Sequence, residues 1–357
     1  MGYAKISSKS PYAPIRYEAK FAFILPEFVK WHKGLNELDS MDVHVVLTWL
    51  YAHIERWNLD IIDASVALDL IRYGHYCKSG KITYDISSLL LETLAHTDVD
   101  NVPISAIKLP HQMVYLHFGK FSDVYQGVFI SEEADGSRGG AYIFDFVYHN
   151  FATESLKNGD WDTEYASNST LYYTTGNEDL ATVLKLEKAT ALSTLDKAIG
   201  AISVTEMSIE EKNIMYANRL HSLDQNHKHM ALALNSLFYL NAAADDVVDD
   251  WGSDAPAANL EKIKREKTAG GKKSLEDGLY SAGYRKVKYL GRRFAQSQQG
   301  LTMAEHLGSG RSVATHWRRG HFKQQPYGKN SELRKLIFVA PVLINPEGVQ
   351  QGRIYTV

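Results

Sequence analysis

Apolar residues recur at intervals of three and four in two N-terminal segments of the chain, residues 26–58 and 84–96. This spacing places apolar side chains along one face of a helix, which a folded protein buries. In the second segment, Asp85 or Ser87 stands where a helix cap is expected, just before a cluster of leucines. Both segments are predicted to be helices that pack on a core, whereas the proline-punctuated residues 1–20 are predicted to form an extended arm.

The period of the pattern changes between residues 104 and 150. Three short segments there, 114–118, 124–130 and 141–148, are rich in β-branched and aromatic residues, which is the composition of strands. Asp-Gly and Gly-Gly pairs between the second and third segments supply turn chemistry. An antiparallel meander is therefore predicted, followed by a loop in the Asn- and Ser-rich residues 153–170.

Two long helices are predicted next, one after Asn177 and one after Ser208. Asn177 can cap the first helix, and Ser208 with Glu211 has the spacing of a capping box at the start of the second. Residues 230–240 of the second helix are apolar nearly all round. A helix of that kind is buried on every side, so this stretch is expected at the centre of the fold.

An acidic run at residues 245–250 precedes a shift to Gly, Ser, Ala and Pro, and then to Lys. The shift predicts an acidic α+β body over residues 21–250, a flexible Lys-rich linker over 251–273 and a basic domain over 274–357. The basic domain is expected to contain a β-hairpin with its turn at 326–330. The predicted fold class is α+β: a helical N-terminal part with the meander, two long central helices, and a small basic C-terminal domain that contains β-structure.

The composition is that of a globular protein, since 45% of the 357 residues are apolar and 23% are charged. No apolar run reaches the roughly 20 residues that cross a bilayer, and the first residues lack the apolar run of a secretory signal. No membrane partner and a cytoplasmic location are therefore expected. Cys77 is the single cysteine, so neither an internal disulfide nor a cysteine-rich zinc site is expected.

The net charge of −3 conceals a strong asymmetry along the chain. Residues 261–357 hold 19 of the 39 basic and 7 of the 42 acidic residues, a net of +12, which leaves 20 basic and 35 acidic residues, a net of −15, in residues 1–260. Either the basic part binds a polyanion, of which nucleic acid is the commonest in a cell, or the two parts neutralise each other across an internal interface.

The densest cluster of cations and aromatic residues lies in residues 311–323. Guanidinium groups bind phosphate and flat rings stack on exposed bases, so the cluster predicts an RNA-binding strand. A metal-free ribonuclease could use the same residues, with His316 or His321 as general acid or base. In a third interpretation the strand packs on the acidic body, with Trp317 and Phe322 in a core. The predicted RNA-binding residues are Arg311, His316, Trp317, Arg318, Arg319, His321, Phe322 and Lys323.

The acidic run contains Asp245, Asp246, Asp249 and Asp250, and on a helix the i, i+4 spacing would pair these carboxylates for Mg²⁺. Because a second aspartate-rich motif is missing, a solvated helix end is the favoured interpretation. The sequence has no phosphate-binding loop, nucleophile elbow or HExxH motif. No metal and no cofactor is therefore predicted, and whether the protein is an enzyme is left open.

The His-x-Arg-Arg-Gly-His-aromatic run of residues 316–322, followed by a turn and a short β-segment with Pro341, resembles the C-terminal signature of a type V-A anti-CRISPR family found in phages and plasmids. The similarity extends over residues 312–345. Weaker similarities follow the same order along the chain, at residues 49–57, 109–115 and 142–145.

The resemblance implies a protein that binds the nascent N-terminal polypeptide of a type V-A CRISPR effector nuclease and triggers degradation of the mRNA being translated. The implied partners are this polypeptide, the mRNA or ribosome, and a host nuclease if the protein does not cleave RNA itself. Peptide binding is assigned to residues 21–250, with the meander at 114–148 as the candidate, and RNA or ribosome binding to residues 261–357. The alternatives are a toxin-like ribonuclease that needs no metal and a non-catalytic module that binds RNA or the ribosome.

Overall fold

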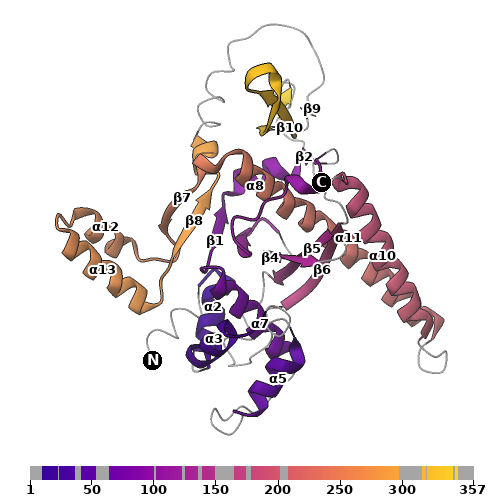
Figure 1. Ribbon diagram of the computed structural model, residues 1–357, viewed down its shortest axis with the longest axis horizontal. Coiled ribbons are helices and arrows are strands. Elements are labelled where there is room, and N and C mark those ends of the chain that lie inside the picture. The colour runs from indigo at the N-terminus through magenta and orange to yellow at the C-terminus, as the bar shows by residue number, and fades with distance from the viewer. Residues whose placement is uncertain are drawn as a thin grey trace, which may run out of the picture.

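A mixed β-sheet with helices on both faces lies at the centre of the structure (Figure 1). The computed structural model describes residues 10–22, 24–36, 42–53, 64–99, 102–122, 125–135, 139–148, 165–173, 178–201, 208–296, 316–318, 320–340 and 342–344. Within these residues the sheet has seven strands. They are β1 (Thr83–Ile86), β3 (Met113–His117), β4 (Tyr125–Asp135), β5 (Gly139–Tyr148), β6 (Tyr165–Tyr173), β7 (Val248–Trp251) and β8 (Lys286–Leu290).

The strands follow the order β6-β5-β4-β3-β1-β8-β7. β1 pairs in parallel with β3 and β8, and the other neighbours in the sheet are antiparallel. The predicted meander is confirmed as β3, β4 and β5. β6 adds a strand where a loop was predicted, so that prediction is wrong for residues 165–170. At the edge of a sheet a strand needs few apolar residues, and over residues 169–173 the buried positions are Ser169 and Leu171.

Helices cover both faces of the sheet. The residues of β3 are all buried, and they alternate between the two faces because successive side chains of a strand point in opposite directions. Met113 and Tyr115 join one core cluster, and Val114 and Leu116 join the other. The first cluster includes helices α2 (Ala13–Lys20), α3 (Leu25–Lys33), α5 (Val43–Tyr51) and α7 (Ala64–Lys78). The second includes α8 (Ser88–Ala95), α10 (Leu180–Ala201) and α11 (Ile209–Ala242). The α+β class is confirmed.

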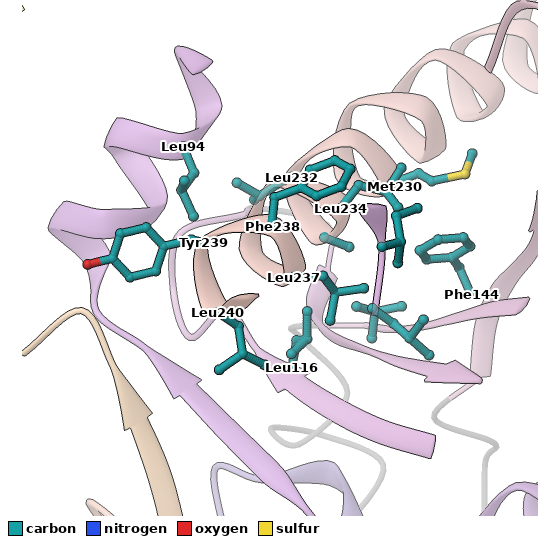
Figure 2. Close-up of a cluster of buried hydrophobic side chains, with 14 of the residues drawn as sticks. Leu94, Leu116, Phe144, Met230, Leu232, Leu234, Leu237, Phe238, Tyr239 and Leu240 are labelled. Atoms are coloured by element: carbon teal, nitrogen blue, oxygen red, sulfur yellow. The ribbon is translucent and has the colours of Figure 1, made fainter. Parts of the chain in front are cut away.

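Helix α11 begins and packs as predicted. Ser208 Oγ accepts a hydrogen bond from the Glu211 N–H at 3.2 Å, and the Glu211 carboxylate accepts one from the Ser208 N–H at 2.7 Å, which completes the capping box. Residues 230–240 lie in the core between the sheet and α8 (Figure 2). The amide of Asn235, buried among them, donates to the carbonyls of Leu94 at 2.9 Å and Thr97 at 3.1 Å.

The N-terminal segment belongs to the core. Residues 13–20 form α2, so the prediction of an extended arm is wrong there, and residues 1–9 lie outside the described residues. Pro14 stands in the first helical turn, where its missing N–H needs no partner. Ala13 and Tyr17, one turn apart, are fully buried. Pro14 thus starts a helix rather than marking an extended segment.

The predicted domain boundary after residue 250 is also wrong, because it falls within β7, which pairs with β8 in the central sheet. The predicted flexible linker at 251–273 contains helix α12 (Ala257–Arg265) and the start of α13 (Ala269–Ala282). Ala, Lys, Glu and Arg are strong helix formers, and Thr268 Oγ1 caps α13 by accepting from the Gly271 N–H at 3.1 Å. The charge-rich composition therefore belongs to exposed helices.

The acidic run is not α-helical, so the i, i+4 arrangement of its carboxylates does not form. α11 ends at Ala242, and a 3₁₀ turn, η3 (Ala244–Asp246), leads into β7; a second such turn, η1 (Ile104–Ala106), precedes β3. Asp246 is buried and accepts from the Tyr239 hydroxyl at 2.7 Å and the Arg293 N–H at 2.8 Å. The described residues contain no group of three or more His, Cys, Asp or Glu that could hold a metal ion. None of the described helices is both long and apolar enough to span a bilayer.

His229 on α11 is buried and bonded as a neutral imidazole. Its Nδ1 donates to the Gln225 carbonyl at 2.7 Å, and its Nε2 accepts from the Ser122 hydroxyl at 2.6 Å. Burial, with a smaller contribution from the charge of Lys228, lowers the pKa of His229 below its ordinary value of 6.5.

Because the unfolded chain then binds the proton more readily than the folded one, the free energy of unfolding is expected to fall as the pH drops below about 6.5. His229→Gln should remove this contribution, so that the wild-type and variant stabilities converge toward acid pH. Urea unfolding of both proteins between pH 5 and 7.5 measures it. A difference between the two proteins that stays constant with pH would contradict the neutral, buried histidine.

Candidate functional site

The predicted C-terminal hairpin is confirmed. β10 (Gly320–Tyr327) pairs antiparallel with β11 (Leu333–Val339), and β9 (His316–Arg318) pairs antiparallel with β12 (Val342–Ile344) in a separate two-stranded sheet. The turn contains a 3₁₀ segment, η5 (Lys329–Ser331), with left-handed backbone at Gly328 (φ 81°) and Asn330 (φ 59°). Glycine and asparagine are the residues that adopt this conformation most readily, which explains why the chain reverses here.

Aromatic rings attach the hairpin to the body. Phe322 is only 8% exposed, and its ring centroid lies 5.5 Å from that of Phe238 on α11 and 5.1 Å from that of Phe338 on β11. Phe338 in turn lies 5.2 Å from Tyr239. β10 also pairs in parallel with β2 (Thr97–Asp98) of the body. In addition, the Gly320 N–H donates to the His96 carbonyl at 3.3 Å. The hairpin is therefore fixed at its base, and it projects beyond the body, in yellow in Figure 1.

One face of the hairpin is turned away from α11. Residues that lie opposite each other in an antiparallel pair share a face, so the Phe322–Phe338 pair defines the inner face and the alternate pairs define the outer face. The outer face, the name used from here on, consists of His321, Lys323, Gln325, Tyr327, Leu333, Lys335, Ile337 and Val339. Tyr327 is 49% and Leu333 53% exposed, and both lysines are exposed. The outer face thus combines cations with a free aromatic ring.

The predicted RNA-binding residues divide into four groups. His321 and Lys323 lie on the outer face. Phe322 is buried against α11, so its prediction as an RNA-binding residue is wrong, and the packing interpretation is correct for this residue. His316, Trp317 and Arg318 lie in β9, whereas Arg311 and Arg319 lie outside the described residues.

Six of the eight outer-face residues lie outside the predicted RNA-binding set, and Tyr327 and Lys335 are the two that add a ring and a charge. Tyr327 closes the strand at the turn, and Lys335 lies opposite Gln325 on β11. The pairing register of the two strands identifies these residues. Counting outward from the turn places every second residue of both strands on the same face as Lys323.

The basic part was predicted either to bind a polyanion or to be neutralised by the acidic part, and each interpretation fits a different set of its cations. Those next to β8 neutralise acids of the body, in the pairs Arg285–Glu18 (2.9 Å), Lys288–Asp249 (2.9 Å) and Arg292–Asp250 (3.0 Å). Within the described residues, Lys323, Lys329 and Lys335 of the hairpin make no ion pair. The hairpin therefore docks through rings, and its lysines are available to a polyanion.

His321 has a carboxylate at the adjacent ladder position. It pairs in register with Asp98 of β2, and side chains at paired positions of a parallel ladder lie on the same face. No ion pair between the two side chains is formed. For the ribonuclease interpretation, the described residues thus place one histidine near one carboxylate.

A cavity of about 500 Å³ lies between α2, α3 and α7. Its polar side is built on Glu18, whose carboxylate accepts from the Tyr73 hydroxyl at 2.7 Å, from Arg285 at 2.9 Å and from Lys81. Burial alone would raise the pKa of Glu18, but the two cations lower it below its usual value, so the carboxylate is ionised. The other lining residues are Ala22, Leu25, Pro26, Val29, Lys33 and Cys77.

Comparison with known proteins shows the class of this protein. The model of an anti-CRISPR family matches residues 84–346, most of the chain, so the chain belongs to that family. It is the AcrVA2-like family, described as anti-CRISPR type V subtype A2. Among solved structures, the chain is similar to one titled "Crystal structure of AcrVA2", with a TM-score of 0.47 and 13% identity, over 92% of this chain and 98% of that one. A comparison with curated proteins found no match.

The family prediction is confirmed, and the family match covers the seven-stranded sheet, α8, α10–α13 and the hairpin. That the run at 316–322 carries the membership stays a prediction, because the match is far longer than this run. Helices α2, α3, α5 and α7 precede the matched residues. The cavity is therefore lined mainly by residues outside the match, with Arg285 inside it.

Phe322→Ala is expected to release the hairpin from the body. Replacing a buried Phe by Ala costs about 3–5 kcal/mol in a core, and here the loss falls on one local contact. Amide hydrogen exchange should show lost protection over residues 320–339, with the central sheet still protected. Leu333→Ala, at an exposed outer-face position, is the control and should leave the protection unchanged.

High salt should leave the same amides protected, because rings rather than ions hold the hairpin. Unchanged protection in Phe322→Ala, or loss of protection in salt, would contradict aromatic docking.

Proposed function

We propose that this protein lowers production of a type V-A CRISPR effector nuclease by recognising its nascent polypeptide and promoting degradation of its mRNA. Membership of the anti-CRISPR family supports the target system. The observation that carries the RNA part is the outer face of the hairpin, which is fixed to the core at its base and exposed toward its turn.

The outer face suits single-stranded RNA. Lys323 and Lys335 supply charge for phosphates, and Tyr327 supplies a ring on which an unpaired base can stack. Base–aromatic stacking is worth about 1–3 kcal/mol per base and is tolerant of sequence. Such a surface holds a message without reading it, so selectivity has to come from the polypeptide.

The faces of the meander are not available for a peptide, because the buried residues of β3, β4 and β5 are packed under helices. The cavity at Glu18 offers an alternative within the residues assigned to peptide binding. Its wall of Ala22, Leu25, Pro26 and Val29 suits an apolar side chain, while Lys33, Lys81 and Arg285 outnumber Glu18. We assign the nascent polypeptide to this cavity. An apolar side chain of the polypeptide would pack on the apolar wall, and an acidic residue next to it in the polypeptide would meet the excess of cations.

Recoding the effector gene separates recognition of the polypeptide from recognition of the RNA. The N-terminal coding segment of the effector is fused to a reporter, either with synonymous codons or with a compensated frameshift that keeps the RNA nearly constant and changes the peptide. We expect the reporter mRNA to fall with the synonymous version and to persist with the frameshifted one, measured by quantitative PCR.

Ala22→Trp, which fills the cavity from an exposed position on its wall, should abolish the fall in reporter mRNA, whereas Lys30→Gln on α3, which does not line the cavity, should not. Loss of the mRNA with the frameshifted reporter would show that RNA sequence, not the polypeptide, is recognised.

Replacing both outer-face lysines, Lys323→Gln with Lys335→Gln, should weaken binding to a U-rich single-stranded RNA. Each phosphate contact contributes about 0.7 to the slope of log affinity against log salt, so the slope should fall by about 1.4 and the affinity roughly tenfold at moderate salt. The charge-matched control is Lys185→Gln with Lys197→Gln on α10, which should bind as wild type. Equal weakening by both pairs would rule out the outer face.

The same mixture tests the ribonuclease. The RNA is expected to remain intact in the absence of metal, because the outer face is proposed as a binding surface and the in-register pairing of His321 with Asp98, both described residues, supplies no ion pair between the two groups. Cleavage that His321→Ala abolishes would instead identify the protein as the nuclease.

A further inference from the structure

Helices α12 and α13 form a helical hairpin that stands away from the sheet, at one side of the molecule in Figure 1. It is inserted between β7 and β8, two neighbouring strands at one edge of the sheet. α12 has no buried residue, and in α13 only Leu279 is buried. A pair of helices that buries so little contributes little to the core, so its function has to lie on its surface.

The base of this helical hairpin is firmly held. The rings of Trp251 and Tyr280 lie 4.8 Å apart, and the Gly252 N–H donates to the Arg285 carbonyl at 2.9 Å. Lys286 pairs with Glu276 at 2.9 Å. α13 ends at Gly283, whose φ of 103° a side chain would disfavour. The two helices therefore form an ordered arm that presents its far end at a fixed place.

The far end is strongly cationic. Residues 262–273, called the tip from here on, hold six basic residues and one acid, Glu266. Glu266 is already engaged, since it accepts from the N–H and hydroxyl of Thr268 at 2.8 and 2.7 Å. Lys264 and Arg265 lie within 3.3 and 3.9 Å of the Glu261 carboxylate. Within the described residues, the other four cations of the tip are exposed and make no ion pair: Lys262, Lys267, Lys272 and Lys273.

The surroundings of these lysines identify the kind of partner. Protein interfaces are anchored by aromatic side chains and depleted in lysine, and membrane-binding helices need an apolar face. The uncharged exposed residues of α12 and the tip are instead small or polar: Ala257, Ala258, Asn259, Thr268, Ala269 and Gly270. Lysine charges surrounded by small or polar residues are suited to contact a phosphate backbone. Such contacts contribute affinity without recognising bases.

We infer that the tip binds the phosphate backbone of double-stranded RNA, as a second contact besides the outer face. The inference rests on the proposed function for its choice of RNA. The two contacts differ in chemistry: the outer face needs unpaired bases for Tyr327, and the tip needs phosphates alone. Folded RNA of the ribosome or the message supplies such a backbone next to single-stranded segments.

Three quadruple variants of the full-length protein test the tip. The tip variant replaces Lys262, Lys267, Lys272 and Lys273 by Gln, the rescue variant replaces them by Arg, and the charge-matched control replaces Lys30, Lys108, Lys185 and Lys197 by Gln. All twelve substitutions are at exposed positions. Binding to an RNA duplex of about 20 base pairs is measured by fluorescence anisotropy at several salt concentrations, with a DNA duplex of the same sequence as a second probe.

The tip variant should lose at least tenfold in affinity for the RNA duplex, and its salt slope should fall by about 3.6, or about 0.9 for each of the four lysines. The rescue variant and the control should bind as wild type. Equal weakening of the tip variant and the control, wild-type affinity in the tip variant, or tighter binding to DNA than to RNA would overturn the inference.

The same variants separate the inference from the proposed function. A tip variant with wild-type duplex binding, beside an outer-face variant that loses single-stranded RNA, overturns the inference and leaves the proposed function standing. Duplex binding through the tip, combined with a reporter mRNA that does not respond to the protein, supports the inference and overturns the proposed function.

Discussion

Residues 230–240 of α11 carry apolar side chains nearly all round the helix, and such a helix has to be covered on every side to be stable in water. The sheet covers one side, and α8 covers another. The C-terminal hairpin covers the end, through Phe322 and Phe338 against Phe238 and Tyr239. The position of the candidate RNA-binding surface thus depends on the burial of this one helix. Burial of this helix fixes both the core and the position of the hairpin. The outer face therefore has a defined direction relative to the body.

The elements that follow from local sequence could be predicted, and those that depend on distant pairing could not. The capping box at Ser208 and the turn at Gly328 are signals within a few residues, and both elements formed as expected. β8 is a short strand of mixed polarity that exists because β1 and β7 lie beside it, so no local period marks it. At 251–273, runs of lysine and glycine indicated a linker, although the same residues have high helix propensity and a Thr268 cap.

The candidate site was predictable in position but not in orientation. The cluster at 316–323 was found from its composition, yet which of its side chains are free depends on the surface that the strand packs against. Phe322 is the anchor of the hairpin, whereas its neighbours His321 and Lys323 are half-buried and exposed, respectively. Alternation along one strand suggests this distinction only once α11 is known to lie beneath it. The fold likewise separates the cations of the basic part. Those near β8 pair with acids of the body, whereas within the described residues the hairpin lysines and the four exposed lysines of the tip make no ion pair.

The central claim is that the protein brings a nascent polypeptide and its message together. Affinity purification of the tagged protein from translating cells that carry the effector, with sequencing of the bound RNA and identification of the attached nascent chains, tests it most directly. Enrichment of one message together with its N-terminal translation product, lost when translation initiation on that message is blocked, is the expected result. Recovery of diverse RNAs without a common nascent chain, or of the same message after initiation is blocked, would contradict it.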